Sequence, residues 1–294
     1  MSVSLANPGG KGPIFVVASG RSGSTVFFEI LAKHPDVAWL SAVARRYPRR
    51  ARLNRWVMHA RSVPLVDRLL PARLGPSEAY PFWDMNCPGF SNPFRDLGAD
   101  DVTRASASRL RETIGHTLTR KRQRFLAKIT GWPRVLYLRE IFPSASFIEV
   151  SRDPCAVATS LLEVPFWDGW RGPPNWRRGA LPPDLQALWR EERQSFVALA
   201  AIECVIFERA MRKCREIVPR AQMHTVHYAR FCAEPVEVLR EVADFCGLNW
   251  SRSFESAIGR VRLRNRDSKW RDCLTEDQQA VLLRTLSRAS AAVD

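Results

Sequence analysis

One stretch near the amino terminus, VVASGRSGSTVFFEIL at 16–31, constrains the fold more than any other part of the chain. The apolar run 13–18 has the composition of a buried parallel strand, and 25–33 has the apolar spacing of a helix with one buried side. The glycine-containing turn between them would present backbone N–H groups and the positive end of a helix dipole to an anion. The stretch therefore predicts a strand, a phosphate-binding turn and a helix.

The turn lacks the lysine of an ATP-binding loop. In the pattern GxxxxGK[ST] a lysine follows the second glycine, whereas here Ser24 follows Gly23 and a cation stands earlier, at Arg21. Ser22, Ser24 and Thr25 still supply hydroxyl groups. Without that lysine, and without a strand ending in Asp before residue 150, the site is poorly suited to hydrolysis of a magnesium-bound nucleotide. A glycine-rich turn without a ligand is the simpler alternative.

Strand-like and helix-like segments alternate along the rest of the chain. This alternation predicts a P-loop-like three-layer α/β fold, with a central parallel β-sheet flanked by helices. Residues 1–12 are predicted to be a flexible N-terminus, and 13–294 a single domain in which 41–125 and 163–184 are helical or irregular insertions on the acceptor side. Further strands are expected at 34–40 (a turn and a short strand), 124–130, 146–151 and 222–228. Helices are expected at 98–125, 134–142, 152–162 (a turn and a helix), 183–218 (one or two) and 235–247.

The chain is strongly basic. Lysine and arginine number 45 against 30 acidic residues, a formal net charge of +15. Such a charge indicates an anionic partner: a nucleic acid, a membrane surface or a small polyanion. No uninterrupted block of five to eight basic residues is present, so a nucleic-acid-binding tail is not supported. A solvated surface that happens to be basic is the alternative.

The cysteines and apolar segments bear on the cellular location. The seven cysteines are odd in number and form no CxxC pair, which favours reduced thiols in a cytoplasm over a disulfide framework or a metal site. The N-terminal residues lack the apolar segment of a signal peptide. No apolar run approaches the ~18 residues of a membrane-spanning helix, so a cytoplasmic protein without a metal is expected.

Four blocks resemble one known family. Residues 15–37 (FVVASGRSGSTVFFEILAKHPDV) are similar to the opening of the sulfotransferases that use 3′-phosphoadenosine 5′-phosphosulfate (PAPS), and the blocks 142–162, 226–250 and 262–271 resemble later segments of that family in the same order. The resemblance implies that the 5′-phosphosulfate is held by Arg21, Ser22, Gly23, Ser24 and Thr25, the 3′-phosphate by Arg152 and Ser160, and the adenine by Tyr228, and that a basic loop with Arg264, Arg266, Ser268 and Lys269 closes over the 3′-phosphate.

The charge distribution of PAPS agrees with this pattern. A small polyanion with phosphates at both ends of an adenosine needs two separated cationic sites. Arg21 and Arg152 each stand at a predicted turn between a strand and a helix. The alternative for Arg152 is a local ion pair with Asp153 at the start of a helix, worth at most ~1 kcal/mol.

Sulfuryl transfer needs cations at the transferring group and a proton acceptor for the attacking hydroxyl. Arg21 is one candidate cation, and Lys128 is implied as a second, with a solvated lysine at a strand end as its alternative. Many family members carry a glutamate directly after the strand that matches 37–40 (VAWL), but this chain continues SAVARRYP. The candidate bases are therefore His59, Asp84, His116 and Glu163.

Two tryptophan-containing segments, 164–179 and 80–90, are candidates for acceptor recognition. Exposed Trp faces suit a sugar ring, a phenol or a glycolipid at a membrane interface, whereas the simpler alternative is packing against the core.

The sequence thus predicts sulfuryl transfer from PAPS to a hydroxyl of a carbohydrate, glycolipid or phenolic acceptor, with release of PAP. We expect no nucleic-acid partner. We expect peripheral contact of the protein with an anionic membrane surface. The alternatives are a P-loop nucleotide kinase or NTPase, and a non-catalytic basic protein that binds nucleic acid.

Overall fold

A five-stranded parallel sheet forms the centre of the computed structural model, which describes residues 11–71, 74–91 and 94–291. The strand order is β2–β3–β1–β4–β5, and every neighbouring pair is parallel. The strand bounds are β1 (Ile14–Ala18), β2 (Val37–Trp39), β3 (Arg124–Thr130), β4 (Ser146–Ser151) and β5 (Met223–His227). The predicted α/β class with a central parallel sheet is therefore confirmed. Residues 1–10 of the expected flexible N-terminus lie outside the described residues.

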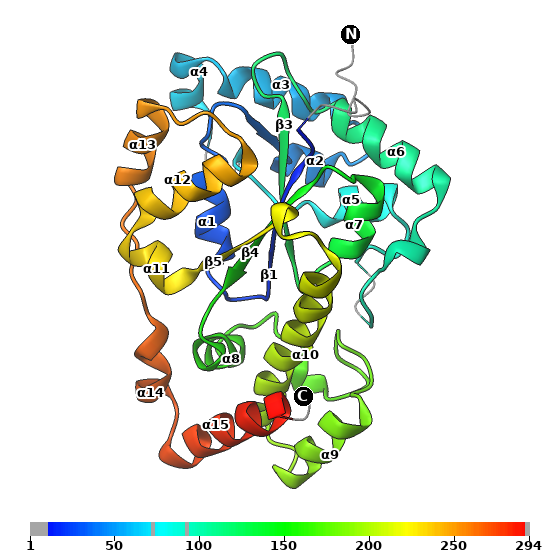
Figure 1. Cartoon of the computed structure of the whole chain (residues 1–294), viewed down its shortest axis with the longest axis vertical. Coiled ribbons are helices and arrows are strands. Elements are labelled where there is room, and N and C mark those ends of the chain that lie inside the picture. The colour runs from blue at the N-terminus through cyan, green and yellow to red at the C-terminus, as the bar shows by residue number, and fades with distance from the viewer. Residues whose placement is uncertain (1–10, 72–73, 92–93, 292–294) are drawn as a thin grey trace.

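Helices cover both faces of the sheet. In Figure 1, α1 (Ser24–Leu31), α11 (Tyr228–Ala233) and α12 (Pro235–Cys246) lie to one side, and α6 (Arg104–Gly115) and α7 (Val135–Ile141) lie to the other. All five residues of β1 are buried, as expected for a central parallel strand covered on both faces. The remaining helices on these sides are α2 (Ala42–Arg46), α3 (Ala51–Arg61), α4 (Pro64–Leu69), α5 (Tyr80–Asn86) and α13 (Arg252–Gly259).

A second group of helices lies beyond the carboxyl ends of the strands. The long helix α10 (Phe196–Ile217) packs against α8 (Pro154–Leu162) and α15 (Glu276–Ala291), in the lower half of Figure 1. Buried side chains of α8 and α10 join Trp167 and Leu282 in a core of their own. The carboxyl edge of the sheet therefore faces a helical wall. This group also includes α9 (Pro183–Glu191) and α14 (Trp270–Cys273).

The structure differs from the expected elements at 98–125, and at 183–218, where one helix or two were expected, it has two. The helix expected at 98–125 is a short 3₁₀ turn, Ala99–Asp101, followed by α6, which Thr103 caps by accepting a hydrogen bond from the N–H of Ser106 at 3.1 Å. The segment 183–218 is two helices, because Arg193 and Gln194 between them have positive φ angles of 53° and 56°, which a continuing α-helix does not allow.

All seven cysteines are free thiols. In the part of the chain that the structure describes, no helix combines the length and the apolar character needed to cross a bilayer.

Candidate functional site

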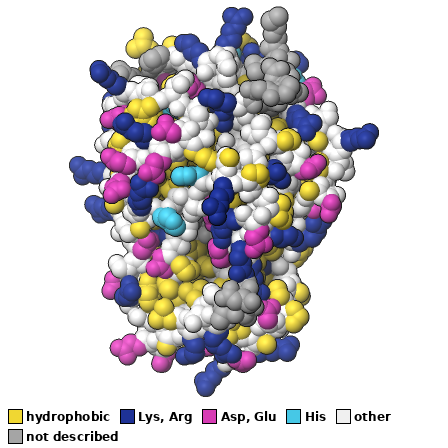
Figure 2. Space-filling view, viewed as in Figure 1, with side chains coloured by type: hydrophobic (Ala, Val, Ile, Leu, Met, Phe, Trp, Pro, Cys, Tyr) yellow, Lys and Arg dark blue, Asp and Glu magenta, His cyan; other side chains and the backbone are white. Residues whose placement is uncertain are grey.

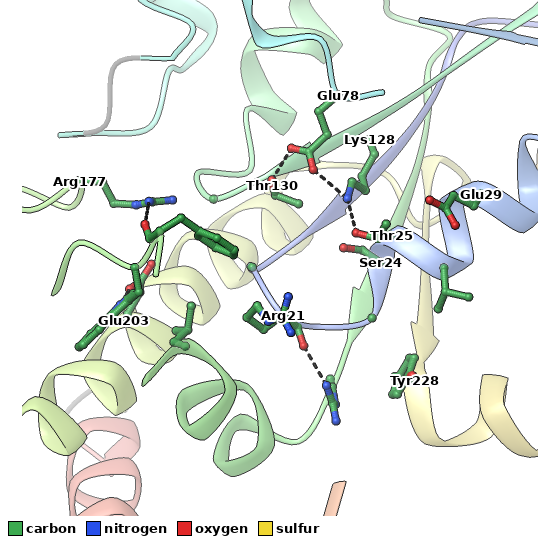
Figure 3. A pocket seen from close by; sticks show the side chains of 18 of the residues that line it. Arg21, Ser24, Thr25, Glu29, Glu78, Lys128, Thr130, Arg177, Glu203 and Tyr228 are labelled. Atoms are coloured by element: carbon green, nitrogen blue, oxygen red, sulfur yellow. Dashed lines mark hydrogen bonds and ion pairs between the residues drawn. The ribbon is translucent and has the colours of Figure 1, made fainter. Parts of the chain in front are cut away.

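The turn between β1 and α1 forms one side of a pocket of about 430 Å³ at the carboxyl edge of the sheet (Figure 3). We call this the transfer pocket; Gly20, Arg21, Ser24, Thr25, Glu78, Lys128, Thr130, Arg152 and Tyr228 are among its lining residues. It lies where the N-terminus of α1 points, so the helix dipole favours a negative group there.

The turn has the conformation of an anion-binding loop. Gly23 is the residue before α1 and has a φ of 82°, and a Cβ atom there would lie 2.2 Å from the ring of Tyr228. Only glycine therefore fits between the turn and that ring. The buried Oγ of Ser22 has no hydrogen-bond partner in the structure. An unsatisfied buried hydroxyl beside a helix N-terminus is compatible with a phosphate oxygen as its missing partner.

Arg21 and Arg152 line the same pocket. Because β1 and β4 are neighbours, the turns that follow them meet: Arg152 Nη1 donates to the carbonyl oxygen of Arg21 at 2.9 Å, and Arg21 Nε donates to Ser160 Oγ at 3.0 Å. Asp153 caps α8 by accepting from the N–H of Cys155 at 2.7 Å. The structure thus brings the two predicted cationic residues together, and Arg152 pairs with Asp267 rather than with Asp153, the partner that the local ion-pair alternative requires.

Arg152 is held by two further side chains. Its Nε donates to Asp267 Oδ1 at 2.7 Å, and its guanidinium lies 4.9 Å from the centre of the Tyr228 ring. Burial, followed by a hydrogen bond with Cys232, raises the pKa of Tyr228 to about 12, so this phenol is neutral near pH 7. Asp267 had no predicted role, although it lies within the basic block 262–271.

The other residues predicted in that basic block do not line the transfer pocket. Arg264, Arg266 and Ser268 are exposed, and Lys269 pairs with Glu163 at 3.1 Å. The hydrogen bond from Lys269 is the largest cause that lowers the pKa of Glu163. Glu163, a candidate base, is therefore engaged outside the pocket.

A buried lysine reaches the turn from the neighbouring strand. Lys128 of β3 is only 4% exposed, and its Nζ donates to Thr25 Oγ1 at 2.6 Å and pairs with Glu78 Oε1 at 2.8 Å. Thr130 Oγ1 donates to the other carboxylate oxygen of Glu78 at 2.6 Å (Figure 3). The ammonium group that an ATP-binding loop carries within its own turn is here supplied from β3.

Glu78 was not predicted. The chain after β2 pairs with residues 76–77, through the Ser41–Pro76 bridge and the hydrogen bond from the N–H of Ser77 to the carbonyl of Leu40 at 2.7 Å. This pairing places the Glu78 carboxylate beside the end of β2. The family resemblance implies a glutamate directly after that strand in the sequence, whereas here the carboxylate comes from residue 78. A signal was available, since Asp67 and Glu78 are the only acidic residues between 41 and 83.

The other candidate bases lie elsewhere. His59 is exposed on α3, and Asp84 on α5 accepts hydrogen bonds from the N–H and Oγ of Ser91. His116 is half-buried at the end of α6. None of these three lines the transfer pocket.

A smaller cavity of about 230 Å³ adjoins the transfer pocket. The two share Thr130, Gly131, Arg177 and Arg178 as lining residues, and the aromatic side chains of the smaller one are Tyr80, Phe90 and Trp132. We call it the aromatic cavity. It lies beyond the end of β3, next to Gly131 and Trp132.

Most of the tryptophan-rich segment is packed inward. Trp167 and Trp176 are buried, and Trp167 Nε1 donates to Glu203 at 2.8 Å. Arg178 pairs with the same carboxylate at 3.1 Å. These contacts anchor the segment to α10 and leave Trp170 as its exposed tryptophan.

A parallel sheet whose first strand leads through a glycine-containing turn into a helix, with two convergent arginines and a lysine–glutamate pair beside that turn, defines an α/β protein with a P-loop-like anion site. The sequence profile of the sulfotransferase family matches residues 13–252. The chain therefore belongs to the sulfotransferase family and is a sulfotransferase enzyme.

Solved structures share this fold. Sulfotransferase STF9 from Mycobacterium avium matches with a TM-score of 0.56 and 16% identity, over 97% of this chain and 78% of the other. Sulfotransferase STF1 from Mycobacterium tuberculosis H37Rv matches with a TM-score of 0.50 and 17% identity, over 92% and 76% of the two chains. The sulfotransferase domain from the curacin biosynthetic pathway has a TM-score of 0.50 and 12% identity, over 93% and 96%. A search of curated protein sequences gives no match.

Proposed function

We propose that this sulfotransferase takes its sulfuryl group from PAPS and transfers it to a hydroxyl group of a small or lipid-linked acceptor. The observation that carries the proposal is the meeting of the β1–α1 turn, Lys128 and Glu78 in one pocket. An anion site, a buried cation and a carboxylate are the three parts that such a transfer needs.

The residues present fit PAPS as the donor. The turn around Gly23 and the unpartnered Ser22 hydroxyl suit the 5′-phosphosulfate, and Arg152 with the Tyr228 ring suits the opposite, 3′-phosphorylated end. Charge-assisted hydrogen bonds from arginine to phosphate are among the strongest in proteins. Because Arg21 and Arg152 line one pocket, a single nucleotide can engage both.

Lys128 and Glu78 have complementary roles in the transfer. Lys128, fixed between Thr25 and Glu78, supplies positive charge where it develops on the oxygens around sulfur and on the leaving phosphate. Glu78, oriented by Thr130 and Lys128, accepts the proton of the acceptor hydroxyl. In this step the bond from sulfur to the phosphate oxygen breaks, a bond from sulfur to the acceptor oxygen forms, and PAP leaves.

The aromatic cavity is the acceptor site in this proposal. Its aromatic lining suits a sugar ring or a phenol, and a glycolipid could present one such ring there. The alternative of a kinase or NTPase is disfavoured because Ser24 stands where those loops carry lysine. We also propose a cytoplasmic location, from the free cysteines.

One experiment tests this function. The protein is incubated with PAPS labelled in its sulfuryl group and with a panel of sugars, phenols and glycolipids, and label transfer is followed together with PAP release. Transfer to at least one acceptor is expected, with the Glu78→Gln variant as the inactive control. If PAP fails to bind while ATP with magnesium binds, the proposed donor is wrong.

A further inference from the structure

The helices α3 and α4 expose apolar side chains to an unusual degree. Trp56 is 72% exposed, Leu65 74% and Leu69 84%. They lie at one end of the long axis, where hydrophobic and basic side chains mix over α3 and α4 (Figure 2). Among the side chains that the structure describes, half of the large apolar ones that are exposed fall in the segment 47–69, namely Tyr47, Trp56, Val63, Leu65, Val66 and Leu69. Such a concentration marks an interaction surface.

The exposed residues share one side of the two helices. Arg52, Trp56 and His59 are spaced by four and three residues, so they follow the solvent side of α3, while Asn54 and Met58 are buried on its other side. On α4, Leu65 and Leu69 are one turn apart and are both exposed. We call this surface the α3–α4 face.

Positive charge surrounds the α3–α4 face. Between residues 41 and 70 the chain has eight arginines and one acidic residue, Asp67. That single carboxylate is paired with Arg61 at 2.7 Å. Of the arginines here whose side chains the structure describes, the exposed ones are Arg45, Arg46, Arg49, Arg50 and Arg52. Almost half of the net charge of the whole chain therefore lies within 30 residues.

A basic hollow of about 810 Å³ adjoins this surface and reaches back to α13. Arg61 of α3 and Asp67 of α4 line it, together with Arg45 of α2. The buried Nε of Arg61 has no hydrogen-bond partner, and the guanidinium of Arg122 contacts backbone carbonyls and a hydroxyl rather than a carboxylate. The cations lining the hollow, Lys33, Arg45, Arg61, Arg122 and Arg260, outnumber the acids Glu29 and Asp67.

We propose that the α3–α4 face binds the surface of an anionic lipid bilayer. Trp56, Leu65 and Leu69 would enter the boundary between headgroups and acyl chains, and the arginines would attract the negative headgroups, as in interfacial amphipathic helices. The hollow offers a place for a headgroup phosphate. This inference does not depend on the sulfuryl donor or acceptor, and its test needs no activity.

Charge and exposure favour the bilayer over other partners. A nucleic acid would be attracted by the arginines but would give Leu65 and Leu69 no apolar environment. A second copy docked symmetrically would bring two strongly basic surfaces together, which like-charge repulsion opposes. The tryptophan-rich segment predicted for membrane contact is less suitable, because Trp167 and Trp176 are buried.

Sedimentation with phosphatidylcholine vesicles, with and without phosphatidylglycerol, tests the proposal. The full chain is expected to bind only the vesicles that contain phosphatidylglycerol. The double variant Trp56→Ala/Leu69→Ser should bind roughly tenfold more weakly, and Arg52→Gln and Arg55→Gln about fivefold more weakly each. Trp170→Ala and Arg190→Gln, exposed residues of the other helical group, are the matched controls and should bind as the unchanged protein does.

Three results would overturn the proposal. The first is no binding to phosphatidylglycerol vesicles, or equal binding by Trp56→Ala/Leu69→Ser and the unchanged chain while both have the same circular dichroism spectrum. The second is tight DNA binding that only the arginine variants weaken, which would assign the surface to a nucleic acid. The third is a dimer in light scattering that Trp56→Ala/Leu69→Ser converts to a monomer, which would assign the surface to a second copy.

Discussion

Arg152 Nε donates a hydrogen bond to Asp267 Oδ1 across 2.7 Å, and both side chains are largely buried at the edge of the transfer pocket. A carboxylate therefore occupies one donor of the guanidinium that we assign to the 3′-phosphate. The nucleotide has to compete with this carboxylate or lie beside it, and either arrangement weakens binding.

The Asp267→Asn variant is expected to bind PAP about threefold to tenfold more tightly, because the amide removes negative charge next to the phosphate site. Isothermal titration calorimetry at two salt concentrations measures this, and the gain should shrink at high salt. Asp272→Asn, an exposed acid of the same region, is the control. Weaker binding by Asp267→Asn would mean that Asp267 instead positions Arg152 for the nucleotide.

Loss of either arginine should weaken PAP binding. Arg21→Ala and Arg152→Ala are each expected to reduce the affinity about tenfold to a hundredfold, since a charge-assisted hydrogen bond contributes about 1.5–3 kcal/mol. The exposed Arg190 provides a control substitution to alanine. Unchanged PAP affinity of both Arg21→Ala and Arg152→Ala would show that one nucleotide does not contact both arginines.

Glu78→Gln should lower kcat by about a hundredfold to ten-thousandfold while PAP binds as before, because the amide keeps the shape but cannot accept the proton. Glu29→Gln, a second carboxylate of the same pocket, is the matched control and should retain its activity. Steady-state kinetics and calorimetry separate the two effects. An active Glu78→Gln enzyme would exclude this carboxylate as the base.

Gly23→Ala should destabilise the turn by about 1–3 kcal/mol through its positive φ and should disturb Tyr228, which a Cβ there would meet at 2.2 Å. Denaturant unfolding and PAP titration are the measurements. Adding Tyr228→Ala should recover part of the lost stability. At Gly20 a Cβ would have an ordinary contact of 3.8 Å with Leu161, so Gly20→Ala should be mild; equal losses at both glycines would contradict this account.

His34 should make stability depend on pH. It is fully buried, its Nε2 lies 2.9 Å from the carbonyl oxygen of Asn249, and its Nδ1 accepts from the N–H of Asp36. Burial is the largest cause that lowers its pKa from 6.5. The unfolded chain therefore binds more protons just below pH 6.5, and the free energy of unfolding falls as the pH drops.

Denaturant titrations between pH 7.5 and about 5 measure this loss, which should reach up to roughly 1.4 kcal/mol per pH unit. His34→Gln retains a donor toward Asn249 and should remove this part of the pH dependence. His59→Gln, on the exposed side of α3, should leave it unchanged. A His34→Gln variant with the same acid dependence as the parent would show that another group is responsible.

Individual strands and helices could be predicted where a continuous stretch of sequence carries their apolar pattern. The strand expected at 13–18 is β1 (Ile14–Ala18), and the strand expected at 124–130 is β3 with the same bounds. The helix expected at 98–125 was too long: α6 ends at Gly115, a glycine inside the expected helix that is a helix-stop signal. The strand order depends on contacts between distant segments, which local patterns do not contain.

The candidate site was predictable only where its residues are neighbours in the sequence. Arg21, Ser24 and Thr25 belong to a continuous motif, and the structure places them in the transfer pocket. Glu78 reaches it only because residues 76–77 pair with the chain that leaves β2. Asp267 meets Arg152 across a sequence separation of 115 residues. No local pattern indicates either contact.

Lys128 stands opposite Val16 in the pairing of β3 with β1, and this has a consequence for the enzyme's tolerance of change. Since successive side chains of a strand alternate between faces, a slip of this pairing by one residue would turn the ammonium group away from Thr25. Single-residue insertions or deletions within β3 should therefore abolish turnover even in variants that still fold. The chemistry of this protein is tied to the alignment of two core strands as firmly as to the residues that line its pocket.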